Sequence, residues 1–174
     1  MIAVVSGTNR KDPVSIHVAR QYAEILSSLN QEVEIIDLRN MPEDMMFSAL
    51  YDNVGKNPEF NKFREVMNNA DKIVFIIPEY NGSFPGALKV FLDGLDRSKA
   101  LTDKKSGLVG ISAGDQGAGL ALSHFTDILN YCGTHVLGYR LRIPKIDDKV
   151  TDNKITNPVY LDKIHKQIQK LLKF

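Results

Sequence analysis

Two kinds of hydrophobic pattern, short apolar runs and a three-to-four-residue spacing, alternate along the chain. Short apolar, largely β-branched runs predict strands at residues 2–5, 33–38, 72–77, 106–112 and 135–139. Apolar residues that recur every three or four positions predict the intervening helices at residues 14–30, from residue 58, at 86–98, at 120–131 and along 161–172. Such alternation predicts an α/β fold in which a parallel sheet carries helices on both faces, joined by right-handed crossovers.

Two segments stand out in this pattern. Residues 72–77 are apolar without alternation, as expected of a strand covered on both faces, so we place this strand near the centre of the sheet. Residues 39–57 have scattered apolar residues and no period, which predicts a long, partly ordered loop. For its cluster of Met41, Met45, Met46 and Phe47 we favour a subunit contact over a mobile lid or simple loop packing.

Length and charge limit the classes of protein that fit. A chain of 174 residues suits one domain, residues 1–174, with a core that needs no disulfide. The 22 basic and 21 acidic residues leave a formal charge of +1, which gives no field for nucleic acid or anionic lipid. The single Cys132 and the lack of a signal-peptide or membrane-length apolar run predict a cytoplasmic protein whose partners are small molecules or its own copies.

The ligand site should lie in the loops that follow the first, third and fourth strands, because open parallel sheets bind ligands beyond the carboxyl ends of their strands. The first loop offers the hydroxyls of Thr8 and Ser15, the guanidinium of Arg10 and the start of a helix, which together suit a phosphate monoester. Turn and capping roles for Thr8 and Ser15, with Arg10 as a surface charge, explain the loop equally well. The absence of G-x-x-x-x-G-K-[ST] and of G-x-G-x-x-G favours a mononucleotide over other phosphate ligands.

The other two loops suit a flat ligand. Residues 78–86 hold two prolines, two glycines, an aromatic residue and an asparagine, so their stiff backbone can direct N–H groups at the edge of an isoalloxazine ring. Residues 113–119 contain Gly114, Gly117 and Gly119, which would let the backbone approach the other end of that ring, although such a turn needs no ligand to exist.

Two motifs then carry a resemblance. Residues 78–89 read P-E-Y-N-G-S-F-P-G-A-L-K, and the first loop reads G-T-N-R followed by Ser15. The chain therefore resembles the NADPH-dependent FMN reductase family of flavodoxin-like proteins, whose loops read P-E-Y-N-G-S-x-P-G-x-L-K and G-S-x-R with a following Ser. The resemblance implies a three-layer flavodoxin-like sandwich with a five-stranded parallel sheet in the order 2-1-3-4-5.

The resemblance also implies a cofactor, FMN, and assigns residues to it. Those that would hold the FMN phosphate are Thr8, Arg10, Ser15, Ile16 and His17. Those that would line the isoalloxazine are Pro78, Glu79, Tyr80, Asn81 and Gly82, and Ser112, Gly114 and Gly117 would close its far side.

The chain departs from the family where a subunit contact is usual. After L-K the family continues with Asn and then I-D-W-x-S-R, whereas this chain has Val90 and then L-D-G-L-D-R, with Gly94 in place of the aromatic residue. The family implies a homodimer or homotetramer, but these changes leave open whether the usual contact is kept. Asp93 and Arg97 retain the family's spacing, which an exposed ion pair one helical turn apart explains equally well.

The activity implied is NAD(P)H-dependent reduction of a small acceptor through bound FMN. Hydride transfer between nicotinamide and flavin requires stacked rings and no protein acid or base, so we name no catalytic side chain, and isolated histidines predict no metal site. Free flavin, quinones, azo compounds and metal oxyanions remain open as acceptors, as does NADPH against NADH, with Arg140 and Arg142 as candidate partners of a 2′-phosphate.

Three alternatives use the same topology. A flavodoxin-like electron carrier resembles the pattern less, because such carriers have a T-x-T-G-x-T loop and an acidic surface. A receiver domain would need acidic residues after the first strand, where this chain has Ser6 and Gly7. A flavin-binding redox sensor without turnover stays open.

Overall fold

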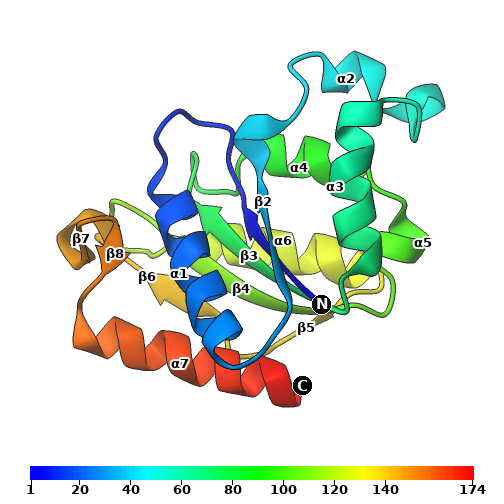
Figure 1. Cartoon of the computed structure of the whole chain (residues 1–174). Helices are drawn as coiled ribbons and strands as arrows, with labels where there is room; N and C mark the ends of the chain where they lie inside the picture. Colours follow the sequence, from blue (N-terminus) through cyan, green and yellow to red (C-terminus); the bar gives the residue numbers. More distant parts are fainter.

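Parallel strands form the centre of the computed structural model, which describes residues 1–174 (Figure 1). Their order across the sheet is β2-β1-β3-β4-β5, as the resemblance implied. Their bounds are Ile2–Ser6 for β1, Val33–Asp37 for β2, Lys72–Pro78 for β3, Lys105–Ile111 for β4 and His135–Val136 for β5. The predicted fold is therefore confirmed, and the order reverses between β1 and β3, where open sheets of this kind bind ligands.

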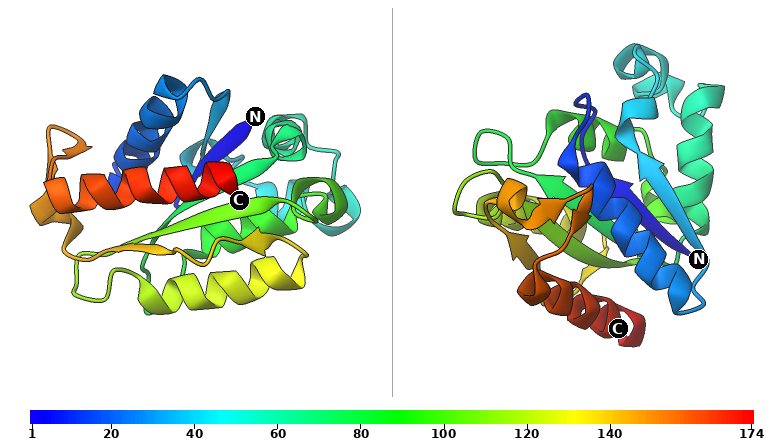
Figure 2. Two further views of the ribbon diagram at one scale, coloured as in Figure 1. Left: turned by 90° about the horizontal axis from the view of Figure 1, so that it is seen from below. Right: turned by 60° about the vertical axis from the view of Figure 1, so that its left-hand side comes forward.

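Helices cover both faces of this sheet (Figure 2). One apolar cluster joins the sheet to α1 (Val14–Ser28) and α7 (Pro158–Lys173). The other joins it to α3 (Pro58–Asn69), α4 (Gly86–Asp93) and α6 (Gly119–Tyr131). Successive residues of β3 enter the two clusters in turn, Ile73 and Phe75 on one face and Val74 on the other, which explains the unbroken apolar run of this central strand.

The fifth strand position differs from the prediction of one strand at 135–139. It is divided into β5 and β6 (Leu141–Ile143), and both pieces pair with β4 in parallel. Between them the buried side chain of Gln167, on α7, replaces strand pairing by donating to the carbonyls of Leu108 at 2.9 Å and Tyr139 at 3.0 Å. The hydroxyl of Tyr22 donates to the Gln167 amide oxygen at 2.7 Å, so both the nitrogen and the oxygen of this buried amide are hydrogen-bonded.

The predicted helix at 86–98 is also interrupted. Helix α4 ends at Asp93, and a separate turn of helix, α5 (Arg97–Ala100), begins after Asp96, whose carboxylate accepts from the Ser98 N–H. A Cβ on Gly94 would lie 2.5 Å from the Phe60 ring, so no larger side chain fits between α4 and α3. The alternative of an Asp93–Arg97 ion pair was wrong, because Asp93 pairs with Lys89 at 2.7 Å within α4.

The segment predicted as a long loop contains three short helical turns. They are η1 (Leu38–Asn40), α2 (Met45–Ser48) and η2 (Tyr51–Asn53), each too short to give a hydrophobic period. Met45 is buried in the core, whereas Phe47 is 82% and Tyr51 87% exposed, so the methionine-rich cluster is divided between core and surface.

A last region was not predicted from the sequence. A turn, η3 (Ile146–Lys149), and a two-stranded hairpin of β7 (Val150–Thr151) and β8 (Lys154–Ile155) connect β6 to α7. The buried side chain of Gln21, on α1, fixes this hairpin by donating to the Ile155 carbonyl at 3.0 Å and accepting from its N–H at 2.9 Å. None of the helices in the structure combines the length and apolarity that a bilayer crossing requires.

Candidate functional site

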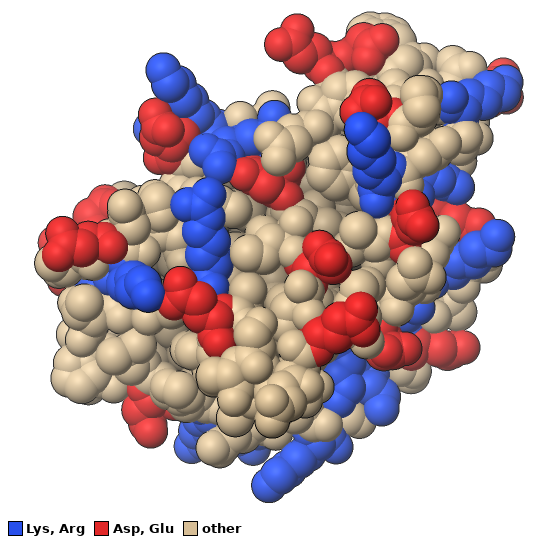
Figure 3. Space-filling view, viewed as in Figure 1, with Lys and Arg blue, Asp and Glu red and all other residues tan.

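A cavity of about 380 Å³ opens at the carboxyl ends of β1, β3 and β4, where the sequence placed the ligand site. We call it the loop cavity, because the three loops after these strands supply most of its lining. The residues around it are Thr8, Arg10, Asp12, Pro13, Val14, Ser15, Pro78, Glu79, Tyr80, Ile111, Ser112, Ala113, Ile146 and Asp147. Acidic and basic side chains are interspersed over the face seen in Figure 3. The charge inside the cavity is therefore set by the residues that line it.

Close packing fixes the first loop where it leaves β1. The N–H of Gly7 donates to the Ile76 carbonyl at 2.9 Å, and a Cβ on Gly7 would lie 2.8 Å from the same oxygen, so glycine is required here. Thr8 and Ser15 are each only 1% exposed, and the Ser15 hydroxyl shares a 2.9 Å hydrogen bond with the hydroxyl of Ser6. The two hydroxyls that the sequence singled out are thus fixed at the base of the cavity.

The same loop carries the only cation of the lining, Arg10, beside a helix N-terminus, while three carboxylates, those of Asp12, Glu79 and Asp147, also line the cavity. Pro13 precedes α1 without a side-chain cap, and the first turn of this 15-residue helix has no acidic residue. Arg10 is exposed, lines the cavity and forms no ion pair. An uncapped helix N-terminus beside a free guanidinium is an arrangement that favours an anion, above all a phosphate.

The second loop contains a rigid two-residue turn. Asn81 and Gly82 both have positive φ, 51° and 73°, and two hydrogen bonds of 2.8 and 3.0 Å pair the backbones of Tyr80 and Ser83 around them. This is the geometry of a type I′ turn, which strongly prefers Asn-Gly. The N–H groups of Asn81 and Gly82 make no hydrogen bond within the protein, so they are available as fixed donors.

Two hydrogen bonds join the second loop to its neighbours. The Tyr80 hydroxyl lies 2.7 Å from the Thr8 hydroxyl on the first loop. On the other side, the Glu79 carboxylate accepts from the N–H of Ala118 at 3.1 Å, at the end of the third loop. The three loops, distant in sequence, are therefore held as one unit around the cavity.

The third loop folds back over β4. The Ser112 hydroxyl donates to the Gly114 carbonyl at 2.8 Å and accepts from the Gly117 N–H at 2.9 Å. Gly117 and Ala118 both take the left-handed conformation, with φ of 57° and 59°. The Gly117 carbonyl lies over Gly110, where a Cβ would be 2.5 Å from it, so this loop needs glycine on both sides of the contact.

The structure brings seven of the thirteen predicted residues to the lining of the cavity. They are Thr8, Arg10, Ser15, Pro78, Glu79, Tyr80 and Ser112. Ile16 is 3% exposed and packs into the core, and His17 follows it on α1 away from the lining. Asn81, Gly82, Gly114 and Gly117 do not line the cavity and belong to the turns that border it. The N–H groups of Asn81 and Gly82 are free, whereas the Gly117 N–H is bound to the Ser112 hydroxyl.

Sequence reasoning missed the far wall of the cavity. Ile146 and Asp147 come from η3, about 27 residues after the end of the third loop, and the N–H of Ile146 donates to the Ser112 carbonyl at 3.0 Å. No motif surrounds them, so no signal in the sequence could have found them. Asp12 and Pro13, in contrast, lie directly beside predicted residues at the start of α1, where a search for helix starts would have included them.

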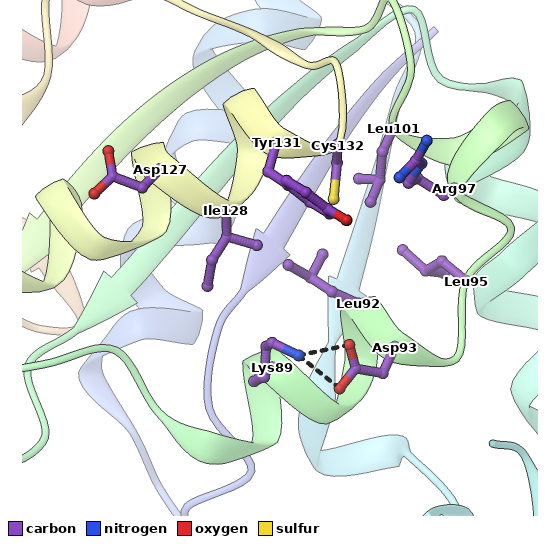
Figure 4. Close-up of a pocket in the computed structure, with 10 residues that line it drawn as sticks. All are labelled: Lys89, Leu92, Asp93, Leu95, Arg97, Leu101, Asp127, Ile128, Tyr131 and Cys132. Carbon is purple, nitrogen blue, oxygen red and sulfur yellow. Dashed lines mark hydrogen bonds and ion pairs between the residues drawn. The ribbon is translucent and has the colours of Figure 1, made fainter. Parts of the chain in front are cut away.

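A larger cavity of about 540 Å³ lies between α4, α5 and α6 (Figure 4), and we call it the helix groove. Its floor is the buried Leu92, Leu95 and Leu101, and charged side chains stand at its rim. Tyr131, the last residue of α6, is 81% exposed there, and the Arg97 guanidinium lies 5.8 Å from its ring centre. Burial raises the pKa of the half-buried Cys132 thiol.

Comparison with known proteins identifies related reductases. The family model described as NADPH-dependent FMN reductase matches residues 1–146. A 2-hydroxy-1,4-benzoquinone reductase of a Burkholderia species is 31% identical over 134 residues, which cover 75% of this chain and 70% of that protein. A quinone reductase of Pseudomonas putida is 32% identical over 130 residues, which cover 71% of this chain and 65% of that protein.

Solved structures share the fold. The flavoenzyme NAD(P)H:(acceptor) oxidoreductase FerB of Paracoccus denitrificans superposes with a TM-score of 0.74 over 99% of this chain and 97% of its own, at 18% identity. At that identity the likeness supports the flavodoxin-like architecture alone.

Proposed function

The chain belongs to the NADPH-dependent FMN reductase family, and from this premise we propose that it is an FMN-containing reductase that passes electrons from NAD(P)H to a small acceptor. The family consists of oxidoreductases, so the protein is an enzyme of that class. The acceptor and the residues that serve each step are inferred below from the loop cavity. Residues 1–174 are proposed to act as one domain, because every main helix packs on the same sheet.

One observation carries the assignment of FMN: the free Arg10 guanidinium stands beside the uncapped start of α1 in a cavity that also holds Thr8 and Ser15. A phosphate monoester needs several N–H and O–H donors and a compensating charge, and these residues supply both. We therefore assign Thr8, Arg10, Ser15 and the first backbone N–H groups of α1 to the FMN phosphate. Ile16 and His17 contribute at most their backbone.

The second and third loops fit the flavin ring. The free N–H groups of Asn81 and Gly82, held by a type I′ turn, are donors suited to the polar edge of an isoalloxazine. Pro78, Glu79 and Tyr80 line the adjoining wall, and the loop from Ser112 to Gly117 forms the other.

The chain's part in the reaction is positioning. Bound FMN would take a hydride from NAD(P)H and deliver electrons to the acceptor. Fixed N–H groups stabilise negative charge that develops on a ligand, and they cost no reorganisation because hydrogen bonds already hold the loops. The links from Tyr80 to Thr8 and from Glu79 to Ala118 maintain that geometry.

Quinones are the acceptor class that we propose, alongside other small electron acceptors. The support is the names of the two relatives, both of which are quinone reductases. Association into a homodimer or homotetramer and a cytoplasmic location stay predictions.

The test is anaerobic rapid mixing of the FMN-loaded protein with NADPH or NADH, followed by addition of a benzoquinone. Bleaching of the flavin absorbance by the nucleotide and its return with the quinone are the expected results. If FMN binds but neither nucleotide bleaches it, the carrier or sensor alternative is correct. If no FMN is retained, the assignment of the loop cavity is wrong.

A further inference from the structure

A second polar cavity, of about 400 Å³, borders the loop cavity. The third loop contributes to both, with Ala113 lining the loop cavity and Asp115 and Gln116 lining the other. Strand β6 also connects them, since Arg142 lines the second cavity and its neighbour Ile143 pairs with Ile111 of the loop cavity. We call this second cavity the basic pocket.

Uncompensated positive charge distinguishes the basic pocket. Arg140, Arg142 and Lys163 line it, and none of the three forms an ion pair. The sole carboxylate in the lining, that of Asp115, is already paired with Lys145 at 2.9 Å. Three free cations around one cavity attract a multiply charged anion, and two guanidinium groups favour phosphate because they can bind it in a bidentate manner.

The backbone adds to this charge. The Arg142 side chain lies against the start of α6, where its Nη1 is 3.0 Å from the position that a Cβ on Gly119 would occupy. Helix α6 has 13 residues, no side-chain cap and no acidic residue in its first turn. The positive end of the helix dipole therefore lies beside the guanidinium, and the Glu79 carboxylate, which accepts from the N–H of Ala118, offsets part of it.

Two tyrosines complete the lining. Tyr139 and Tyr160 bring phenol hydroxyls and flat apolar faces beside the cations. The Lys163 ammonium lies 4.7 Å from the centre of the Tyr160 ring, and Lys166 lies 5.8 Å from that of Tyr139. Hydroxyl donors, aromatic faces and cations together suit a phosphorylated nucleoside better than a simple inorganic anion.

We propose that the basic pocket binds the 2′-phosphate at the adenosine end of NADPH and thereby makes the enzyme prefer NADPH to NADH. The inference rests on the proposed function, which places the nicotinamide end at the loop cavity. From Ala113 to Gln116 the chain can span at most about 11 Å, a distance that a dinucleotide bridges easily. The extra phosphate of NADPH carries close to two negative charges near neutral pH, which matches the free cations.

The experiment uses the full-length, FMN-loaded protein and two readouts. Calorimetry measures the binding of 2′,5′-ADP, 5′-AMP and inorganic phosphate, and anaerobic rapid mixing measures the apparent Kd for NADPH and NADH. The variants are Arg142→Gln and Lys163→Gln. Matched controls are Arg20→Gln, on the exposed side of α1, and Lys170→Gln, on the same helix as Lys163 but outside the pocket.

The wild type should bind 2′,5′-ADP at least about tenfold more tightly than 5′-AMP or phosphate. Each pocket variant should weaken 2′,5′-ADP and NADPH by about 10- to 100-fold, the value of a charge-assisted contact, while NADH and 5′-AMP change less than about twofold. Both control variants should behave as the wild type.

Three results would overturn the proposal: equal affinity for 2′,5′-ADP and 5′-AMP, phosphate binding as tight as that of 2′,5′-ADP, or equal weakening of NADPH and NADH. If neither nucleotide bleaches the flavin, the proposed function fails, and the calorimetric comparison still decides whether the pocket recognises a 2′-phosphate. Should Arg142→Gln fail to fold, Lys163→Gln gives the same test from a different element.

Discussion

The loop cavity and the helix groove differ in a way that separates a ligand site from an apolar surface. The groove is the larger, at about 540 Å³ against 380 Å³, yet three buried leucines form its floor and it holds few fixed polar groups. The loop cavity is smaller, but hydrogen bonds made by the Tyr80 and Glu79 side chains connect its second loop to the first and to the third. Volume alone therefore does not identify the ligand site, because positioning a cofactor requires donors that are already fixed.

The groove suits a different kind of contact. An apolar floor with a charged rim is the composition of an interface between protein surfaces. Here Asp93 is already paired with Lys89, and the Arg97 guanidinium lies over the Tyr131 ring, so part of the rim is internally satisfied. The predictions that follow test whether these two regions are independent of each other.

The largest effect is expected from Gly110→Ala, which alters the loop cavity from beneath. The new Cβ would lie 2.5 Å from the Gly117 carbonyl and 3.0 Å from Ala118 Cβ, so the third loop must move. We expect the free energy of unfolding to fall by about 2 kcal/mol, as for overpacked cores, and FMN to be lost. Urea unfolding and flavin retention measure both, with Gly138→Ala as the control, since a Cβ there meets nothing within 4 Å and Gly138 does not line the loop cavity. Equal behaviour of the two variants would contradict the account.

Arg10→Gln should be second, because it removes the free charge of the proposed phosphate site without disturbing the core. FMN affinity should fall about 10- to 100-fold, measured by quenching of flavin fluorescence, while stability stays unchanged. Riboflavin, which lacks the phosphate, should bind equally to the variant and the wild type. The matched control is Arg20→Gln, and a similar loss of FMN affinity there would show a general charge effect.

Glu79→Ala should come third, since it breaks the link between the second and third loops. The Ala118 N–H would lose its acceptor, which costs about 1–2 kcal/mol in stability and several-fold in FMN affinity. Glu79→Gln retains an oxygen that can accept the same bond, so most of both losses should be restored. Thermal unfolding with and without FMN gives the comparison, and an equal loss in both variants would mean that charge, not the hydrogen bond, is what matters.

Ile128→Lys should have almost no effect on flavin, because Ile128 lines the helix groove. We expect FMN affinity within about twofold of wild type, while light scattering shows a shift toward monomer, since a buried lysine is costly at an apolar contact. Unchanged mass at all concentrations would remove the groove from consideration as a subunit contact. A change in FMN affinity would show that the two regions are coupled.

The smallest effect concerns the Cys132 thiol at the edge of the groove. Its pKa is raised by burial, so the reactive thiolate is scarce near neutral pH. Alkylation by iodoacetamide should be slower than that of a free thiol at the same pH, should rise with pH, and should leave flavin binding unchanged. Rapid labelling near neutral pH would contradict this.

Local pattern decided most of what the sequence could predict. The unbroken apolar run of β3 identified the central strand. Helix periodicity located both ends of α1 and α6, and the C-terminal end of α7, to within two residues. Asn81-Gly82 predicts its own turn, because both residues tolerate positive φ. The errors occurred where distant residues intervene, as where Gln167 replaces strand pairing and Phe60 excludes a side chain at Gly94.

The sequence by itself determined the alternation of strands and helices through hydrophobic period, and the family and the loops that form the site through short motifs. The order of the strands followed only as what the resemblance to that family implies. Tertiary structure alone decided which of their atoms meet: the bonds from Thr8 to Tyr80 and from Glu79 to Ala118, the wall supplied by η3, and the gathering of Arg140, Arg142 and Lys163 around one pocket. The reason is physical, since a periodic pattern reports which side of an element is buried, whereas contacts between elements depend on how their separate surfaces fit together.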